Sequence, residues 1–443
     1  MSVRSILTKI IILPLSDFLL KRTISKHLSF LNKSQWWSKS ELENFQNKRV
    51  KMLMEHSYKN VPYYTNLLNS LNLKPADFQK VEDLKKLPIL TKEDIRTNFP
   101  DLISDKSREK GTFMRASSSG STGEPLQYFL SKDAYSFNIA AGLRAWSWMG
   151  YKLGDKYIKI SQNQRSSKEK KLQDKLMNNE YLFLKDIDDE SLKDAIQIIA
   201  NNNPKIIRCY PDPLEFLAEI ILENNVKMNL KAIATTGNVL HKSAREKIEK
   251  AFSAKIYDGY SCEGSAPFFQ CENHEFYHAA VEYAFSEFVD VVETESGVFQ
   301  GRHIVTNLWN FTTPFIRYDS QDILEWEEKD CSCGRKLLNV RRIIGRDNDV
   351  LITPKGKRLI VHIFTIYFSK VEEVKQFQIV QNSENSIVIN LIVKDSFNDE
   401  TKANILNYWS EIIDDEAVKI DIVLKDEIKA SASGKRRFII KNF

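Results

Sequence analysis

Two groups of residues in this 443-residue chain have types and spacings that could carry chemistry. The first is the stretch SSSGSTGEP at residues 117–125, in which two glycines stand among hydroxyl side chains. Loops that bind phosphate need glycines, because backbone N–H groups must come close to the oxygens, and hydroxyls complete the shell. The stretch is not a P-loop, since Glu124 and Pro125 follow the second glycine where a Lys-Ser/Thr pair would stand. Taken alone, it fits a flexible loop equally well.

The second group combines cysteine with histidine. Cys331 and Cys333 flank one serine, and Cys271 lies upstream with His274 and His278 close behind it. Two cysteines, a third cysteine and a histidine supply the four ligands of a closed tetrahedral zinc site. We predict a structural zinc held by Cys271, His278, Cys331 and Cys333, with His274 as the alternate to His278. The competing interpretation is a set of buried free thiols.

Composition limits the classes of function. The chain carries 64 basic and 59 acidic residues, a formal net charge of +5, without a long basic block, so nucleic acid is not an expected partner. Its five cysteines are unevenly spaced and make no disulfide framework, which favours the cytoplasm. Cys209 and Cys262 have no local histidine or carboxylate that would activate a nucleophile, so both are expected to be packing residues.

The N-terminal stretch from Ile6 to Leu20 is apolar but interrupted by Lys9, Pro14 and Asp17. These interruptions fit neither a membrane-spanning helix nor a secretory signal. This stretch is expected either to contact a membrane peripherally or to form an arm packed on the protein's own surface.

The elements that must position these residues follow from hydrophobic periodicity. Two helices are expected within 40–71, split before Pro62, and Thr91 with Asp94 forms a capping box that starts another. The middle third alternates short apolar runs, at 156–161, 206–210, 231–237 and 254–261, with amphipathic helical patterns. This alternation is typical of crossover units in a mostly parallel sheet.

The last third changes character. Residues 281–326 read as strands with few helices, and a separate segment of strands, one helix and a basic tail follows. We therefore predict an α/β protein with a large N-terminal domain at 1–345, in which 1–39 can form an arm. A small C-terminal domain occupies 346–443.

Five segments carry a resemblance to a known family. SSGSTGEP at 118–125 resembles the phosphate loop of the adenylate-forming superfamily, which includes acyl-CoA synthetases, luciferases and nonribosomal adenylation domains. Four further signatures follow in the order that superfamily requires: YDGYSCEG at 257–264, TPFIRYDSQD at 313–322, GRDND at 345–349 and ASASGKRRF at 430–438. NVPYYTNLL, LPILTKEDIR and CSCGR are most similar to the phenylacetate-CoA ligase branch and its capsule-biosynthesis relatives called CapK. The resemblance implies mixed and parallel sheets with flanking helices, and a mobile α+β lid at the C-terminus.

The resemblance also implies roles for residues near ATP. The loop residues that would surround the phosphates are Ser118, Ser119, Gly120, Ser121, Thr122 and Gly123. Thr122 or Ser121 would offer its hydroxyl to the β- or γ-phosphate, while Leu126 stands where relatives often carry a lysine. Glu263 would help to hold Mg²⁺, and Tyr260 would stack on the adenine, although the order Gly259-Tyr260 departs from the usual Tyr-Gly motif.

Further roles fall on the C-terminal half. Asp322 would accept hydrogen bonds from both ribose hydroxyls, and Arg346 would reach the ribose or the phosphate. Lys435 would bridge the carboxylate and the α-phosphate during adenylation. In relatives the C-terminal domain rotates about a hinge aspartate before the acyl group is transferred to the acceptor. Asn348 stands at that position here, so the sequence does not decide whether this transfer takes place. Arg317 and Tyr318 precede Asp322 as in relatives, and framework packing explains them equally well.

The function implied by this resemblance is an ATP- and Mg²⁺-dependent ligase that converts a carboxylic acid into an acyl-adenylate and passes the acyl group to an acceptor. Coenzyme A, or an amine or hydroxyl on a sugar or lipid carrier, would be that acceptor. Alternatives are a catalytically silent nucleotide-binding scaffold in polysaccharide assembly and a nucleotidyl transferase that leaves AMP on its substrate. The acid's pocket is expected between the central strands and the loop after Tyr260, where Phe268 and Phe269 are either pocket or core. The sequence leaves a homodimer open.

Overall fold

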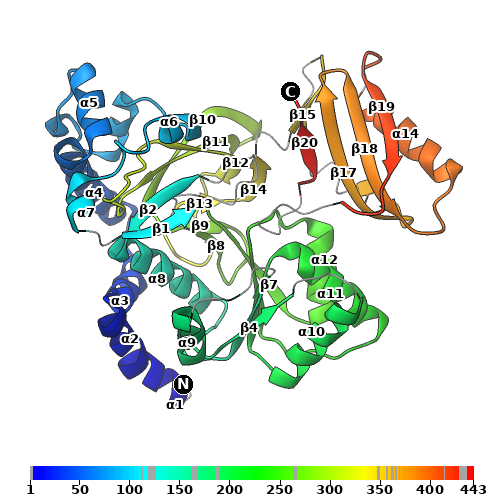
Figure 1. Ribbon diagram of the computed structural model, residues 1–443, viewed down its shortest axis with the longest axis horizontal. Coiled ribbons are helices and arrows are strands. Elements are labelled where there is room, and N and C mark those ends of the chain that lie inside the picture. The colour runs from blue at the N-terminus through cyan, green and yellow to red at the C-terminus, as the bar shows by residue number, and fades with distance from the viewer. Residues whose placement is uncertain are drawn as a thin grey trace.

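The computed structural model describes residues 3–110, 113–117, 126–161, 165, 168–184, 189–262, 267–346, 350–355, 358–360, 364, 367–368, 370–413, 415–428 and 437–443. Within them the chain forms a large α/β body followed by a smaller α+β unit at the C-terminus, as Figure 1 shows. This architecture confirms the predicted fold class. The mobility of the smaller unit and the boundary near residue 346 remain predictions.

Helices make up almost all of the first 110 residues, coloured from blue to cyan in Figure 1. Their bounds are α1 (Val3–Leu7), the π-helical turn η1 (Thr8–Ile12), α2 (Leu13–Leu20), α3 (Ile24–Ser34), α4 (Lys39–Asn60), α5 (Pro62–Ser70), η2 (Pro75–Asp77), η3 (Val81–Lys86), α6 (Lys92–Thr97) and α7 (Asp105–Lys110). The predicted break before Pro62 is confirmed, because Val61 adopts an extended conformation and Pro62 begins α5. The predicted capping box is confirmed as well, with Thr91 Oγ1 accepting from the Asp94 N–H at 3.1 Å.

The central sheet has eight strands in the order β13-β9-β8-β7-β6-β5-β3-β4. Their bounds are β3 (Tyr157–Ser161), β4 (Asn179–Phe183), β5 (Ile206–Cys209), β6 (Ala232–Thr236), β7 (Lys255–Tyr260), β8 (Phe268–Gln270), β9 (Tyr277–Ala279) and β13 (Asn339–Val340). The run from β7 to β4 is parallel, which confirms the predicted crossover units, and the strands beyond β7 pair antiparallel.

Helices cover both faces of the parallel part, and their bounds are α8 (Lys132–Trp148), α9 (Lys168–Leu176), α10 (Asp189–Asn202), α11 (Pro211–Glu223) and α12 (Lys242–Phe252). On one face Ile158, Ile207 and Ile233 are fully buried in a cluster with apolar residues of α10, α11 and α12. The alternate residues of the same strands point to the opposite face, because side chains alternate along a strand. That second face lies toward α8 and the N-terminal helices.

A second, antiparallel sheet has the order β10-β11-β12-β14, with bounds β10 (Ala284–Glu295), β11 (Val298–Asn307), β12 (Tyr318–Glu327) and β14 (Arg342–Arg346). Its long strands occupy the stretch predicted to be rich in strands. A separate hairpin pairs β1 (Phe113–Ser117) with β2 (Gln127–Ser131).

The C-terminal unit, orange to red at the upper right of Figure 1, has its own core. Its elements are β15 (Val350–Ile352), β16 (Arg358–Ile360), β17 (Val374–Ser383), β18 (Ser386–Val393), α14 (Asp399–Ile413), β19 (Lys419–Leu424) and β20 (Ile439–Lys441). The sheet has the order β19-β18-β17-β20, and α14 places Trp409 in the core with no exposed surface. Since burying an indole of this size contributes strongly to stability, this segment has the core that a separate unit requires.

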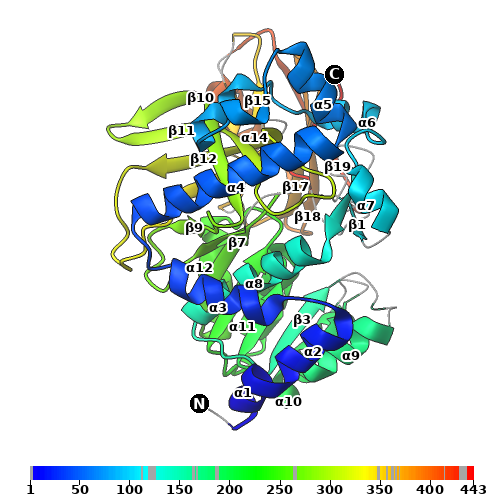
Figure 2. The same cartoon turned by 90° about the vertical axis from the view of Figure 1, so that its left-hand side faces the viewer.

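The N-terminal arm formed by α1, η1 and α2 lies at the lower edge of the molecule in both Figure 1 and Figure 2. Polar contacts with the body include Lys132 Nζ of α8 donating to the carbonyl oxygen of Leu20 at 3.3 Å. Just after the arm, Arg22 Nη1 donates to Gln173 Oε1 of α9 at 3.3 Å. Among the described residues, no helix has the length and apolarity needed to cross a membrane.

Candidate functional site

Tyr260 and Asp322, predicted to hold the nucleotide, meet in the structure. Tyr260 ends β7 of the central sheet and Asp322 lies in β12 of the second sheet, yet the phenol donates to Asp322 Oδ2 at 2.6 Å. Burial, together with the neighbouring Asp322 carboxylate, raises the pKa of Tyr260 well above its usual value, so the phenol remains a donor. The family resemblance implies that Asp322 accepts hydrogen bonds from both ribose hydroxyls, whereas here Asp322 Oδ2 already accepts a hydrogen bond from Tyr260.

His303 of β11 is a third member of this network, and it was not predicted from the sequence. Its Nδ1 lies 3.4 Å from the Tyr260 hydroxyl and its Nε2 lies 2.9 Å from Ser286 Oγ. Complete burial lowers the pKa of His303 to about 3, so the ring is neutral at physiological pH. Its only sequence signal is a polar residue within an apolar strand, which is too weak to reveal a contact with Tyr260. His303 therefore orients the tyrosine that orients Asp322.

Strand pairing brings another predicted residue close. In the register of β12 and β14, Asp322 stands opposite Arg346, so the backbones of these two residues are direct neighbours. The side chain of Arg346 lies outside what the structure describes.

Several predicted residues lie outside the described part of the chain. They are Ser118, Ser119, Gly120, Ser121, Thr122, Gly123, Glu263, Asn348 and Lys435. The flanks of the phosphate loop are described, because Ser117 pairs with Gln127 where β1 and β2 end. Leu126, which replaces the usual lysine, is 2% exposed and packs in a core cluster, so it is a packing residue.

Arg317 and Tyr318 are part of the framework. The Arg317 guanidinium pairs with Glu287 at 3.2 Å and donates to the carbonyl oxygen of Leu87, and its backbone has a positive φ of 54°. Tyr318 is fully buried and its backbone pairs with Leu90. These contacts fix the segment before α6 against β12.

A cavity of about 320 Å³ lies beside Tyr260, on the face of the central sheet toward α8. Its walls include Tyr260, Thr236 and Phe269, so a cavity is present where the acid's pocket was expected. Of the two phenylalanines left open by the sequence, Phe269 lines this cavity and Phe268 is fully buried core.

Two glycines shape this region. A Cβ built on Gly259 would lie 2.4 Å from the Phe269 ring, which explains glycine immediately before Tyr260. At Gly142 of α8, which lines the cavity, a Cβ would meet nothing within 4 Å. Glycine costs about 1 kcal/mol relative to alanine inside a helix, so open space at Gly142 fits a wall left clear for a ligand.

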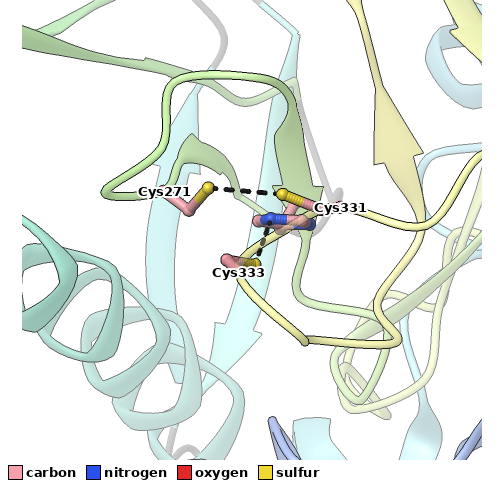
Figure 3. A group of neighbouring side chains, drawn as sticks. Cys271, Cys331 and Cys333 are labelled. Carbon is pink, nitrogen blue, oxygen red and sulfur yellow. Dashed lines mark hydrogen bonds between the residues drawn. The ribbon is translucent and has the colours of Figure 1, made fainter.

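The four predicted zinc ligands converge at one point. The ligand atoms of Cys271, His278, Cys331 and Cys333 all lie within 4.8 Å of one another. Cys271 and Cys331 have their sulfurs 3.7 Å apart, and Cys333 Sγ lies 3.2 Å from His278 Nε2, as the dashed lines of Figure 3 mark. Tetrahedral zinc with Zn–S bonds of about 2.3 Å separates two sulfurs by about 3.8 Å. The donor set and its spacing therefore fit zinc.

The surroundings of this cysteine-histidine cluster also suit a metal. Burial, reinforced by Arg335, lowers the pKa of His278 to about 4, so its imidazole is neutral and able to coordinate. Gly334 has φ of +84°, which lets the chain turn sharply after Cys333. Glu275, which the sequence analysis did not single out, accepts from the Ser332 N–H at 2.8 Å and holds this turn in place.

The remaining candidates lie apart from the cluster. The alternate ligand His274 has φ of +56° and its ring lies 4.4 Å from that of Tyr257. Cys209 is buried in the core and Cys262 is half-buried against another core cluster, which agrees with packing roles for both.

Comparisons with known proteins support the resemblance along most of the chain. Residues 351–442 match the family model described as the CapK C-terminal domain. Protein CapK of Staphylococcus aureus is 27% identical over 423 residues, 91% of this chain and 90% of the relative. The phenylacetate-coenzyme A ligase of Thermus thermophilus is 23% identical over 374 residues, 79% of this chain and 80% of the relative.

Solved structures show the same fold. A crystal structure of 2-hydroxyisobutyryl-CoA ligase in the postadenylation state, in complex with R3-HIB-AMP, superposes with a TM-score of 0.72 at 17% identity, covering 92% of this chain and 93% of the other. An open conformation of the same ligase with 2-HIB-AMP and CoA gives 0.60 at the same identity, covering 92% and 95%. The resemblance to the phenylacetate-CoA ligase and CapK branch of the adenylate-forming superfamily is confirmed, and with it the predicted class of enzyme.

Proposed function

We propose that this chain, an adenylate-forming ligase of the phenylacetate-CoA ligase and CapK branch, activates a carboxylic acid with ATP and transfers the acyl group to an acceptor. The observation that carries the proposal is the place of Tyr260, which lines the cavity and also donates to Asp322 at 2.6 Å. An acid in the cavity and a nucleotide on Asp322 would therefore lie on two sides of one residue. That proximity is what the reaction requires, because an oriented pair of reactants loses little entropy on reacting.

In the proposed first step a carboxylate oxygen attacks the α-phosphorus of ATP. The new C–O–P linkage forms as the bond from the α-phosphorus to the β-phosphate oxygen breaks, and pyrophosphate leaves. Lys435 is our candidate for stabilising the charge that develops on the α-phosphoryl oxygens. The loop from Ser118 to Gly123 would hold the phosphates, and Thr122 is our candidate hydroxyl for the β- or γ-phosphate.

Other residues have proposed roles in binding. Tyr260 would flank the adenine, and Asp322 with Arg346 would hold the ribose. Glu263 would help to hold Mg²⁺, since carboxylate oxygens suit this cation. The cysteine-histidine cluster would hold zinc for structure only, because four protein ligands complete a tetrahedral site.

Coenzyme A is the proposed acceptor, since the relatives that match include ligases named for coenzyme A products. A hydroxyl or amine on a sugar or lipid carrier in capsule synthesis is the alternative, supported by the likeness to CapK. Both transfers release free AMP. A nucleotidyl transferase would release pyrophosphate but leave AMP on its substrate, and a scaffold would release neither pyrophosphate nor AMP. The release of free AMP therefore distinguishes the ligase from both alternatives. The cytoplasm remains the proposed location.

The central experiment measures pyrophosphate release with Mg-ATP across a panel of aryl, fatty, amino and sugar acids. We expect release that depends on the acid, and loss of that release in Lys435→Ala while ATP binding is retained. Lys425→Ala, which changes an exposed lysine of the same unit, is the matched control and should behave as wild type. Equal release with and without acid, or full activity of Lys435→Ala, would refute the proposal.

A second variant tests the cavity. Gly142→Leu would place a side chain into space that is open in the structure, and Gly142→Ala would add one methyl group. We expect the leucine variant to lose activation of the acid and to keep ATP binding, with a much smaller effect for alanine. Unchanged turnover in the leucine variant would place the acid elsewhere.

We also propose that the N-terminal arm contacts a membrane. The arm buries Ser5, Thr8, Leu13 and Asp17 against the body and exposes most of its large apolar side chains, whereas a helix that packs by its apolar face buries them. Phe18 is 80% exposed and Ile10 is 66% exposed. The outward large apolar residues are Val3, Ile6, Leu7, Ile10, Ile11, Leu15, Phe18 and Leu19. A contiguous apolar surface of this kind indicates an interaction site.

The charge around this apolar face supports an anionic lipid surface as its partner. From Val3 to Lys33 the basic residues are Arg4, Lys9, Lys21, Arg22, Lys26 and Lys33, against the single acidic residue Asp17. Asp17 is itself buried and accepts hydrogen bonds from Ser25 at 2.7 and 2.6 Å. Basic side chains beside an exposed apolar helix face match a bilayer with anionic headgroups.

Flotation with phosphatidylglycerol vesicles tests this contact. We expect the wild-type protein to float with these vesicles and to float less with phosphatidylcholine vesicles. We expect an Ile10→Asp, Phe18→Asp double variant to stay in the bottom fraction of the gradient with either lipid. Val292→Asp, which changes an exposed valine on β10, is the matched control and should float. Failure of the wild type to float would overturn the proposal. Self-association without lipid that the double variant abolishes would assign the face to a homodimer instead.

A further inference from the structure

The cavity beside Tyr260 has a strongly basic wall that the proposed chemistry does not use. Lys159 of β3 and Arg208 of β5 both line it, and the register of these parallel strands makes them direct neighbours. Like charges side by side on one face of a sheet repel each other. A pair of this kind is stable when something in the cavity supplies negative charge.

In the described part of the chain, the carboxylate that lines the cavity beside this pair is Asp174. Its two oxygens accept hydrogen bonds from Nε and Nη2 of Arg165 at 2.7 Å each. Asn179 donates to the same carboxylate at 2.7 Å. Within the described part of the chain, neither Lys159 nor Arg208 has an ion-pair partner. Among the described residues, Asp174 therefore compensates Lys159 only in part, by attraction without a direct ion pair.

Burial and repulsion by neighbouring cations are reflected in the pKa of Lys159. Burial, followed by the nearby Arg208 and Arg165, lowers that pKa to about 8. The aromatic rings of Tyr181 and Trp146 lie 5.7 Å from Lys159 Nζ and 5.9 Å from Arg208 Cζ, so they give only weak compensation. Because burial and neighbouring cations disfavour the charged form of Lys159, an anionic group bound beside it would stabilise that form.

The order of the strands places this wall far from the reacting end. Tyr260 is on β7, β6 comes next, and Arg208 and Lys159 follow on β5 and β3. With about 4.8 Å between strands, the basic pair lies two to three strands away, roughly 10–14 Å across the sheet. The distal part of the bound acid would therefore reach the basic pair.

We propose that the acid this enzyme activates carries a second anionic group, a carboxylate or a phosphate, at the end remote from the reacting carboxylate, and that Lys159 and Arg208 bind it. This inference rests on the proposed adenylation of an acid in the same cavity. It excludes simple aryl and fatty acids as the preferred substrates, because an apolar tail would leave both cations desolvated and unpaired.

Matched pairs of acids test the proposal. The pairs are adipate with hexanoate, suberate with octanoate, and 6-phosphogluconate with gluconate. Acid-dependent pyrophosphate release is measured for wild type, Lys159→Met and Arg208→Met. We expect kcat/KM to favour the dianionic member in wild type, and that preference to fall roughly tenfold or more in each variant, since hydrogen bonds to charged groups contribute that much. Equal use of both members of every pair in wild type would overturn the proposal.

A control and a binding measurement separate this inference from the adenylation itself. Lys205→Met changes a basic residue that precedes β5 and pairs with Asp155 at 2.9 Å outside the cavity, so it should keep the preference. Thermal stabilisation of the protein by adipate, but not by hexanoate at equal ionic strength, should appear in wild type and vanish in Lys159→Met. If no acid is adenylated but this difference persists, the adenylation proposal fails and the anion site stands. If adipate and hexanoate act alike, the anion site fails whatever the adenylation result.

The variants carry a second diagnostic. Both should be as stable as wild type or more stable without ligand, because each removes one of two repelling, partly desolvated cations. A purely structural lysine or arginine would instead lower the melting temperature on removal. Loss of stability in both variants together with an unchanged substrate preference would refute the functional role.

The pH dependence has a defined sign. Lys159 must be protonated to bind an anion, so the preference for the dianionic acid should fall as pH rises through about 8. Other charged or titratable groups around it are Arg208, Arg165, Asp174, Lys170, Tyr157 and Tyr181. The preference should lose this pH dependence in Lys159→Met, and a profile that stays the same in that variant would contradict the assignment.

Discussion

Replacing Tyr260 by phenylalanine is the sharpest test of the nucleotide side of the site, because it removes one oxygen and leaves the ring. In the structure that oxygen donates to the buried Asp322 carboxylate at 2.6 Å. A hydrogen bond to a charged group contributes about 1.5–3 kcal/mol. We expect Tyr260→Phe to lower the free energy of unfolding by about that amount, and to raise the Kd for ATP because Asp322 is no longer held in place.

A double-mutant cycle assigns the effect to this contact. Unfolding in urea and ATP titration are measured for Tyr260→Phe, Asp322→Asn and the double variant. Residues in direct contact show coupling energies of about 0.5–3 kcal/mol, so the effects of the single variants should not add. Tyr64→Phe is the matched control, since its buried phenol donates to the Pro314 carbonyl oxygen at 2.9 Å and not to Asp322. It should cost about 0.5–1.5 kcal/mol of stability and leave ATP binding unchanged.

Two results would refute this reasoning. Strictly additive effects of Tyr260→Phe and Asp322→Asn would show that the hydrogen bond contributes nothing to stability or ATP binding. An equal loss of ATP affinity in Tyr64→Phe would show that affinity follows overall stability and not the geometry around Asp322.

Two further predictions concern the metal cluster and the buried histidine. Cys333→Ser should reduce bound zinc, measured by elemental analysis, from about one ion per chain to almost none. The control variant Cys262→Ala, outside the cluster, should retain the zinc. Full zinc content in Cys333→Ser would exclude this site. Since burial lowers the pKa of His303 to about 3, the unfolded chain binds more protons than the native one below about pH 6.5, so stability is lost as pH falls. His303→Gln should remove about 2 kcal/mol of the loss between pH 6.5 and pH 5, and chemical denaturation showing the same pH slope for both proteins would contradict this.

Local patterns in the sequence were sufficient for the fold class. The alternation of apolar runs with amphipathic helices predicted the parallel sheet, since each βα unit shows its own periodicity whatever its neighbours. The capping box at Thr91 and the break before Pro62 are likewise local, because they depend on residues three or four positions apart. The order of strands in the sheet could not be read this way, since it is set by which edges meet.

The cysteine-histidine cluster could be predicted in part from the sequence, unlike the strand order, which could not be predicted at all. Ligand chemistry alone selected Cys271, Cys331, Cys333 and a neighbouring histidine, because few residue types bind zinc and cysteine and histidine are few in the chain. Tertiary structure was needed to separate His278 from His274, which lie four positions apart. The chain turns at His274, so its ring faces Tyr257 and not the cysteines.

The sequence by itself determined the α/β architecture, the order of the family's motifs and the residue types at the cysteine-histidine cluster, because these features are local or depend on composition. Only the tertiary structure placed His303 behind Tyr260, made Lys159 a neighbour of Arg208 and turned the apolar side of the N-terminal arm outward. These three features depend on pairs of segments far apart in the chain. Periodicity shows that a helix or strand has two faces, but which face is covered depends on the packing of distant segments against it.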